Sequence, residues 1–188
     1  KKYEAIYQVN IREALQERLA QPDLTTNFRN DAEAALIGES KYGAGQPYQR
    51  LLGLTLGTGL GSAFIADNVR VVSGPHIPEP DGMLFHEEYK GQWSDELFST
   101  RGLQARFKAA KMDFTHISAA SQAADAGNRA VQQTFHEFGE DLGRFVQPYI
   151  EGFEAEALLV MGGIAGAFAH FQAGIASQIT VPIVAGEL

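Results

Sequence analysis

The sequence contains no cysteine. Disulfide bonds, thiolate catalysis and zinc sites built on cysteine are therefore excluded. The absence agrees with a cytoplasmic protein, and we expect that location. Basic residues are also few, because 15 lysines and arginines stand against 23 aspartates and glutamates, with a formal net charge of -8. This acidic balance argues against a basic surface, so we expect no nucleic acid partner.

Long apolar runs are absent as well. No stretch is long enough to cross a bilayer and no signal peptide opens the chain, so we expect no membrane association. The apolar fraction of 45% is that of an ordinary globular protein. The 188 residues suit one domain or one lobe of a two-lobed protein. Since the chain begins at Lys1 without Met and ends at Leu188 without a closing helix, we expect a fragment of a longer protein.

Hydrophobic spacing and turn residues predict mixed helices and strands, which is an α/β class. Helices are expected at residues 6–19, 32–42, 94–111, 117–124, 128–153 and 165–179. Short strands are expected at residues 24–28, 51–56, 62–66, 69–72, 158–161 and 181–184. Pro148 should kink the longest helix or end one section of it. Residues 74–93 have no clean period and are expected to form a long loop, a kind of segment that is often functional.

Asn30 and Asp31 stand side by side just before an alanine-rich helical run. Both residue types accept hydrogen bonds from the free N–H groups of a first helical turn, and Asp31 suits the positive end of the helix dipole. Helix capping is therefore one explanation. The other explanation is chemical, since Asp31 could take a proton from a hydroxyl group while Asn30 holds a neighbouring one. This stretch alone leaves both open.

Two glycine-rich turns follow predicted strands. In Gly57-Thr58-Gly59-Leu60-Gly61 the glycines would let backbone N–H groups approach a phosphate, although plain hairpins use glycine too. The P-loop and dinucleotide patterns do not fit, because a strand rather than a helix comes next. Gly162-Gly163 lies between a buried strand and a helix, where nucleotides often bind, but close packing of a turn explains it equally well.

The order of these motifs resembles the ROK family of bacterial sugar kinases and repressors, which belongs to the actin-like, hexokinase-like ATPase superfamily. The resemblance extends over most of the chain, from Val9 to Leu188. It implies an actin-like ATPase (ribonuclease H-like) fold, of which this chain would be mainly the larger C-terminal lobe. Residues 1–188 would then be a partial ROK-type sugar kinase domain with its N-terminal lobe largely missing.

The resemblance also implies roles for individual residues. The segment Asn30-Asp31-Ala32, with Gly38-Glu39 closing its helix, looks like the family's Asn-Asp-Ala segment. By that likeness Asp31 is the catalytic base, and Asn30 and Glu39 are sugar ligands. His86 is similar to the family's sugar-binding histidine. The resemblance therefore predicts transfer of the γ-phosphoryl group of ATP to a hydroxyl of a hexose or an N-acetylhexosamine.

The nucleotide side is implied in the same way. Gly57-Thr58-Gly59 looks like the family's second phosphate-binding turn, and Gly162-Gly163 is similar to its adenosine-side turn. The cofactors implied are ATP and Mg²⁺, without a structural zinc. The partners implied are a small-molecule sugar and ATP, and a homodimer is expected for such folds.

Three features depart from the family pattern. The family usually carries Gly-Glu-x-Gly-His after the hairpin, whereas here Met83 replaces the glutamate ahead of His86, and Glu87 or Glu88 could substitute. The cysteine-rich zinc motif is absent, and residues 95–101 instead resemble zinc-free branches of the family. The Asp-Gly-Gly-Thr type phosphate loop is missing, which predicts a poor or inactive kinase for this chain as it stands.

Three functions therefore remain open. The chain could belong to a sugar kinase, to a sugar-responsive transcriptional repressor in which this lobe binds the effector, or to a non-catalytic sugar-binding homologue. An upstream Asp-Gly-Gly-Thr motif would favour the kinase, and an upstream helix-turn-helix would favour the repressor. The sequence does not name the sugar, because the loop over residues 74–93 that should select it carries no readable pattern.

Overall fold

The computed structural model describes residues 4–186, and the chain divides into two compact units, Lys1–Asn30 and Asp31–Leu188. In the first unit a single helical turn, Glu4–Ile6, precedes α1 (Ile11–Arg18). The helix predicted over residues 6–19 is therefore shorter than expected. The strand predicted at residues 24–28 is wrong: this segment is irregular, because no strand among the described residues pairs with it.

A five-stranded sheet forms the centre of the second unit, in the order β3-β2-β1-β6-β7. The strands are β1 (Arg50–Leu56), β2 (Leu60–Ala66), β3 (Val69–Val71), β6 (Ala157–Met161) and β7 (Ile183–Ala185). β1, β2 and β3 are antiparallel neighbours, whereas β6 and β7 run parallel to β1. The sequence prediction is confirmed for all of these strands, with ends that differ by a residue or two.

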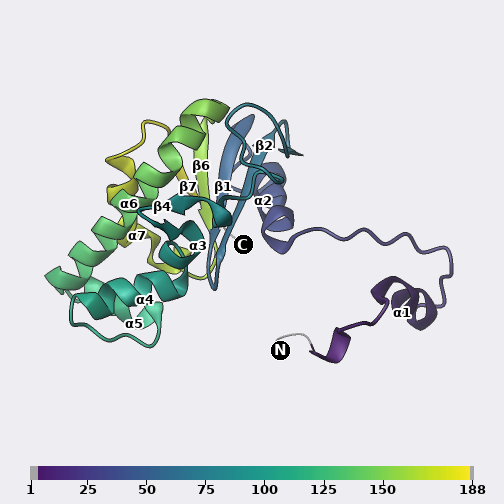
Figure 1. Cartoon of the computed structure of the whole chain (residues 1–188), viewed down its shortest axis with the longest axis horizontal. Coiled ribbons are helices and arrows are strands. Elements are labelled where there is room, and N and C mark those ends of the chain that lie inside the picture. Colours follow the sequence, from purple (N-terminus) through teal and green to yellow (C-terminus); the bar gives the residue numbers. More distant parts are fainter. Residues whose placement is uncertain (1–3, 187–188) are drawn as a thin grey trace. The chain divides into compact units, whose positions relative to one another are not determined.

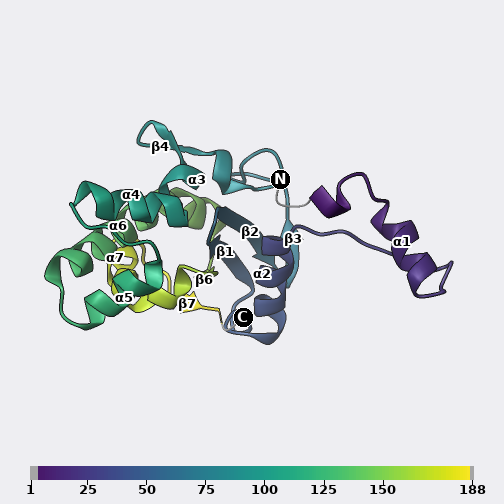
Figure 2. The same cartoon turned by 90° about the horizontal axis from the view of Figure 1, so that it is seen from below.

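Helices cover both faces of this sheet (Figures 1 and 2). α2 (Asp31–Tyr42) packs Leu36 against one face, and the long α6 (Arg129–Phe153) with α7 (Phe168–Ala176) lies on the other. Since both faces are buried, β1 and β6 are apolar along most of their length. The expected α/β class is confirmed. None of the helices within residues 4–186 combines the length and apolarity that a membrane crossing requires.

The segment between β3 and α6 differs most from the prediction. The expected loop over residues 74–93 ends in a single helical turn, Leu84–His86, and a small hairpin of β4 (Glu88–Tyr89) and β5 (Gln92–Trp93). The helix expected at residues 94–111 is broken into α3 (Ser94–Leu97) and α4 (Thr100–Ala109). The break falls where Phe98 enters the core with no exposed surface, so tertiary packing overrides the helical pattern.

The remaining helices agree with the sequence more closely. α5 (Ile117–Asp125) is confirmed, and α6 begins after Asn128, whose side chain accepts a hydrogen bond from the Val131 N–H (3.3 Å). α6 does not end at Pro148 but continues through it to Phe153. The helix expected at residues 165–179 consists of a single turn, Ala165–Ala167, followed by α7.

One buried carboxylate joins several of these elements. Asp141 on α6 accepts hydrogen bonds from Lys90 at the tip of the β4–β5 hairpin (2.6 Å) and from Arg106 on α4 (2.9 Å). Burial alone would raise the pKa of Asp141, but the contacts with Lys90 and Arg106 outweigh burial, so the pKa lies below its ordinary value of 3.8. The ionised carboxylate therefore stabilises the fold.

We predict that Asp141→Asn lowers the free energy of unfolding at neutral pH by about 2 kcal/mol, since Lys90, Arg106 and Arg144 lose a charged partner. Because the folded-state pKa of Asp141 is lowered, this contribution is complete above the ordinary pKa and is lost as the pH falls through the folded-state value. Denaturant unfolding measured from pH 7 downward tests this. Glu137→Gln, which changes an exposed carboxylate on α6, is the control and should change stability little.

Candidate active site

Two glycine turns meet at one edge of the sheet. β1 and β6 are parallel neighbours with Thr55 opposite Met161, so the turns that follow these strands lie side by side. A Cβ atom placed on Gly57 would lie 4.0 Å from the nitrogen of Gly163. The Ile164 N–H donates to the Leu56 carbonyl (2.9 Å) and locks the two turns together. The carboxyl ends of parallel strands are where open α/β sheets bind ligands.

Gly162 occupies the position in which glycine is required. Its φ is +102°, and a Cβ atom at this residue would lie 2.6 Å from the Leu56 carbonyl oxygen. Gly163 is different, because a Cβ atom there would meet nothing within 4 Å. Packing thus explains Gly162, whereas Gly163 leaves open space beside its backbone. Close packing of the turn is therefore confirmed for Gly162, and nucleotide binding beside Gly163 stays a prediction.

The Gly57–Leu60 turn is held from outside by residues of α3 and of the first turn of α4. Thr100 donates to the Gly57 carbonyl from its backbone N–H (2.7 Å) and from its hydroxyl (2.9 Å). Asp95 accepts from the Leu60 N–H at 2.7 Å. Arg101 forms an ion pair with Asp95 and donates to the Thr58 carbonyl at 3.3 Å. Thr58 itself is exposed. The turn is therefore fixed through the carbonyls of Gly57 and Thr58 and through the Leu60 N–H, while Thr58 at its tip is exposed.

Asp31 is the first residue of α2, and its side chain is exposed. One carboxylate oxygen accepts a hydrogen bond from the Ala32 N–H (3.0 Å), so Asp31 satisfies a free donor of the first helical turn, and the capping explanation is confirmed for this residue. A Cβ atom on Gly61 would lie 2.5 Å from that of Ala32. Because Gly61 pairs with Thr55 near the end of β1, α2 begins beside the strand ends that carry the glycine turns.

Asn30 and Glu39 lie in different surroundings. Asn30 is an exposed residue at the end of the first unit. Glu39 lies two turns along α2 from Asp31 and has no exposed surface. Its carboxylate accepts from the Ala44 N–H (3.0 Å) and lies against Gly43 and Gly186. These contacts stabilise the end of α2, and a role of either residue in sugar binding stays a prediction.

His86 lies at the end of a loop that β2 holds. The Ser62 hydroxyl donates to the Gly82 carbonyl (3.1 Å) and accepts from the Leu84 N–H (2.9 Å). The His86 ring is exposed beside Phe85, with ring centroids 3.5 Å apart. It lines a cavity of about 310 Å³ together with Phe85, Trp93, Asp95 and Glu96. Asp95 therefore contacts both this cavity and the glycine turn.

The two acidic residues that could replace the family glutamate point in different directions. Glu87 accepts a hydrogen bond from the Tyr149 hydroxyl of α6 (2.9 Å). Burial, with this hydrogen bond second, raises the pKa of Tyr149 above its ordinary value. Glu88 lines a separate cavity with Trp93. Met83 is half-buried at the start of the Leu84–His86 turn. The Glu87 carboxylate therefore binds α6 and does not take the place of the family glutamate.

A second cavity, of about 240 Å³, lies between α5 and the residues that follow β6. Its polar lining comes from Ser118, Ser121 and Gln122 of α5. Gly163 and Gly166 line the other side, and a Cβ atom on either would meet nothing within 4 Å. Sequence analysis did not identify the α5 residues. The spacing of Ser118 and Ser121, which places them on one helix face, is the only signal that the sequence offers.

The structure therefore brings together part of the predicted site. The glycine turns, the start of α2 and the cavity beside α5 surround the ends of β1 and β6, and the His86 cavity is joined to them through Asp95. Within residues 4–186 no hydrogen bond or ion pair joins Asp31 with His86. In the same part of the chain, no three histidine or acidic side chains are grouped so that they could hold a metal ion.

Comparisons with known proteins agree with this architecture. The family model described as "ROK family" matches residues 1–186. The glucokinase of Thermotoga maritima is 26% identical over an alignment of 169 residues, and the alignment covers 74% of this chain and 51% of the glucokinase. The chain therefore spans about half the length of this curated relative.

Solved structures show the same fold in proteins of two kinds. A ROK family glucokinase from Streptomyces griseus, in complex with glucose and AMPPNP, matches with a TM-score of 0.72 and 21% identity over 94% of this chain and 67% of its own. A ROK family transcriptional regulator, a homologue of the E. coli MLC protein, matches with a TM-score of 0.72 and 19% identity over 92% of this chain and 50% of its own. At these identities the likeness concerns the fold, and the fold expected from the resemblance, that of the actin-like ATPases, is confirmed.

We predict that Asp95→Ala loosens the Gly57–Leu60 turn, because the Leu60 N–H loses its acceptor and Arg101 loses a partner. Amide hydrogen exchange at Leu60 should become faster by on the order of tenfold, with little change elsewhere in the sheet. Glu96→Ala is the matched control, since Glu96 pairs with the same Arg101 (2.9 Å) but does not contact Leu60. Equal exchange in both variants would contradict the proposed role of Asp95.

Proposed function

We propose, given that this chain belongs to the ROK family, that it is part of an ATP-dependent sugar kinase and forms most of its larger lobe. The observation that carries the proposal is the meeting of two glycine turns, one of them open to solvent, beside the helix that begins with Asp31. Backbone N–H groups at such turns suit phosphate oxygens. The glucokinases among the relatives support the same class of reaction.

In the proposed reaction Asp31 accepts the proton of a sugar hydroxyl. The hydroxyl oxygen then forms a bond to the γ-phosphorus of ATP as the bond from that phosphorus to the ADP oxygen breaks. Phosphoryl transfer depends on positioning and charge stabilisation more than on covalent catalysis, which suits a site made of one exposed carboxylate and fixed backbone donors. His86, with Asn30 and Glu39, is proposed to contact the sugar.

The nucleotide is proposed to lie along the two turns. The Gly57–Gly59 turn would hold phosphate oxygens, and Gly162-Gly163 would border the adenosine in the cavity beside α5. The open space at Gly163 and the three polar side chains of α5 fit a nucleoside. Mg²⁺ would neutralise phosphate charge, and it would be held largely by the phosphates and water. A homodimer and a cytoplasmic location remain predictions.

The main alternative is a sugar-responsive regulator, because a ROK transcriptional regulator has the same fold. In that case the lobe would bind a sugar without chemistry. The replacement of the family glutamate by Met83 favours a third candidate, a non-catalytic sugar-binding homologue. Since the chain contains no Asp-Gly-Gly-Thr phosphate loop, we expect it to transfer phosphate poorly by itself. The complete gene product is therefore the material for activity measurements.

We predict that Asp31→Asn lowers sugar phosphorylation by about 10²- to 10⁴-fold, because the amide cannot accept the proton. A panel of hexoses and N-acetylhexosamines with ATP measures this loss. Asp113→Asn, which changes an exposed carboxylate outside the site, serves as the control. If the wild-type protein binds a sugar but turns over none, the kinase proposal is wrong and the regulator or binding homologue stands.

A second prediction separates ligand binding from packing at the other turn. Gly163→Ala should leave the melting temperature nearly unchanged but weaken ATP binding by about tenfold, because its new methyl group enters open space where the ligand is proposed to lie. Gly162→Ala should instead lower the free energy of unfolding by about 2 kcal/mol, since φ is positive and the Leu56 carbonyl is close. Thermal unfolding and calorimetric titration with ATP distinguish the two effects. Unchanged ATP affinity in Gly163→Ala would remove the nucleotide from this turn.

A further inference from the structure

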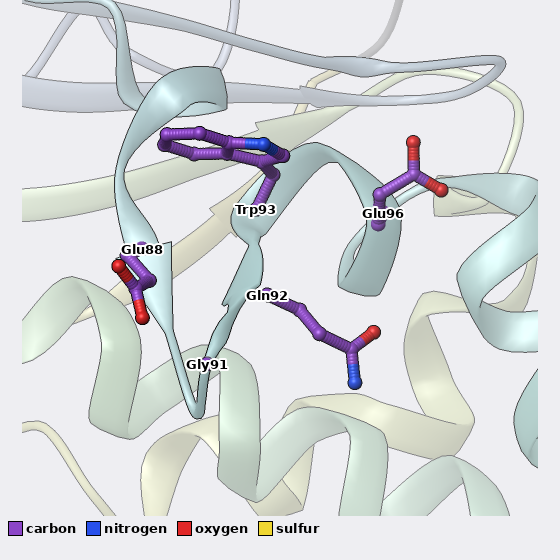
Figure 3. A pocket seen from close by; sticks show the side chains of 5 residues that line it. All are labelled: Glu88, Gly91, Gln92, Trp93 and Glu96. Atoms are coloured by element: carbon purple, nitrogen blue, oxygen red, sulfur yellow. The ribbon is translucent and has the colours of Figure 1, made fainter.

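The β4–β5 hairpin carries a large aromatic side chain at the surface. Trp93, the single tryptophan of the chain, is 57% exposed. Tryptophan is usually well buried, so an exposed indole beside a cavity indicates a binding surface. Figure 3 shows the indole at the end of β5, with Glu88 on the neighbouring strand and Glu96 on α3.

The hairpin is firmly anchored, so the exposure of Trp93 does not come from a loose loop. Lys90 at its tip pairs with the buried Asp141 at 2.6 Å. The Tyr89 ring packs against Phe98 and Phe145, with ring centroids 5.7 Å from each. Directly after Trp93, the buried Ser94 donates from its N–H to the Glu87 carbonyl (2.9 Å). The chain on either side of Trp93 is therefore anchored, through Tyr89 and Lys90 before it and through Ser94 after it.

Trp93 and Glu96 line two cavities. One, of about 310 Å³, includes His86, and the other, of about 390 Å³, includes Glu88, Gly91 and Gln92. Trp93 and Glu88 are directly opposite in the hairpin register, so their side chains share a face. Within residues 4–186 no hydrogen bond is formed by the side chains of Glu88 and Gln92 or by the indole N–H. These polar groups are available to a ligand.

The chemistry of this surface suits a neutral sugar. A flat indole packs against the C–H face of a pyranose ring, while carboxylate and amide groups bind its hydroxyls. Arg101 pairs with Glu96 (2.9 Å) and also with Asp95, whereas Glu88 forms no ion pair among residues 4–186. A carboxylate repels anionic ligands but accepts hydrogen bonds from hydroxyl groups. Gly91 has no side chain to obstruct approach.

We propose that the Trp93 surface binds the second ring of a disaccharide whose first ring lies on the His86 side. The inference rests on the proposed function, because it extends the sugar site that His86 is assigned to. The observation that carries it is that Trp93 and Glu96 line both cavities, so the two cavities are neighbours on either side of the same residues. The surface lies at the end of the loop over residues 74–93, so this loop selects the length of the sugar as well as its identity.

Calorimetric titration of the protein with glucose, maltose and cellobiose tests this proposal. A disaccharide should bind about tenfold more tightly than glucose, and Trp93→Ala should remove most of that ratio. Tyr42→Ala, which removes an aromatic side chain of α2 that is 84% exposed, is the matched control and should preserve the ratio. Because the chain has one tryptophan, fluorescence of the 188-residue chain should change on binding of the disaccharide.

The outcomes separate this proposal from the kinase proposal. If glucose is bound and phosphorylated in an Asp31-dependent reaction but neither disaccharide binds more tightly, only the second-ring site is wrong. The same conclusion follows if Trp93→Ala keeps the wild-type ratio of disaccharide affinity to glucose affinity. If neither disaccharide binds and no hexose or N-acetylhexosamine of the phosphorylation panel binds, both proposals are wrong. Glu88→Gln, which keeps the size of the side chain, should also lower the ratio, so the test does not depend on one variant.

Discussion

The parallel pairing of β1 with β6 is the constraint on which the rest of the site depends. The two strands are about a hundred residues apart in the chain, yet Thr55 lies opposite Met161 in their register. This register places two glycine turns at the same edge of the sheet. A shift of one residue would turn the buried side chains of either strand to the opposite face and separate the Ile164 N–H from the Leu56 carbonyl.

The short segment from the hairpin to α4 connects the two halves of the proposed site. Asp95 bonds the Leu60 N–H and also lines the His86 cavity, so the phosphate side and the sugar side share one carboxylate. The segment is itself held to α6 through the contact of Lys90 with Asp141. Such anchoring keeps the two sides in fixed positions, which phosphoryl transfer requires because its catalysis is mostly positioning.

The fold does not decide between a kinase and a regulator, since solved structures of both kinds match this chain equally well by TM-score, at 0.72. Function depends on what is placed on the fold. Here the exposed carboxylate of Asp31 and the open backbone at Gly163 support catalysis. The replacement of the family glutamate by Met83 points the other way, and Glu87 does not compensate for it because it binds Tyr149.

The sequence by itself determined the strands of the central sheet, the helix that begins at Asp31 and the two glycine turns, because hydrophobic period, caps and glycine act over neighbouring residues. It failed at residues 24–28, where a strand needs a partner, and at Phe98, where burial breaks a helix. Only the tertiary structure decided that Asp95 holds the Leu60 turn, that α5 lines a cavity beside Gly163, and that the indole of Trp93 remains exposed. These features join residues far apart in the chain, and such contacts depend on the register and packing of whole elements, which no local pattern encodes.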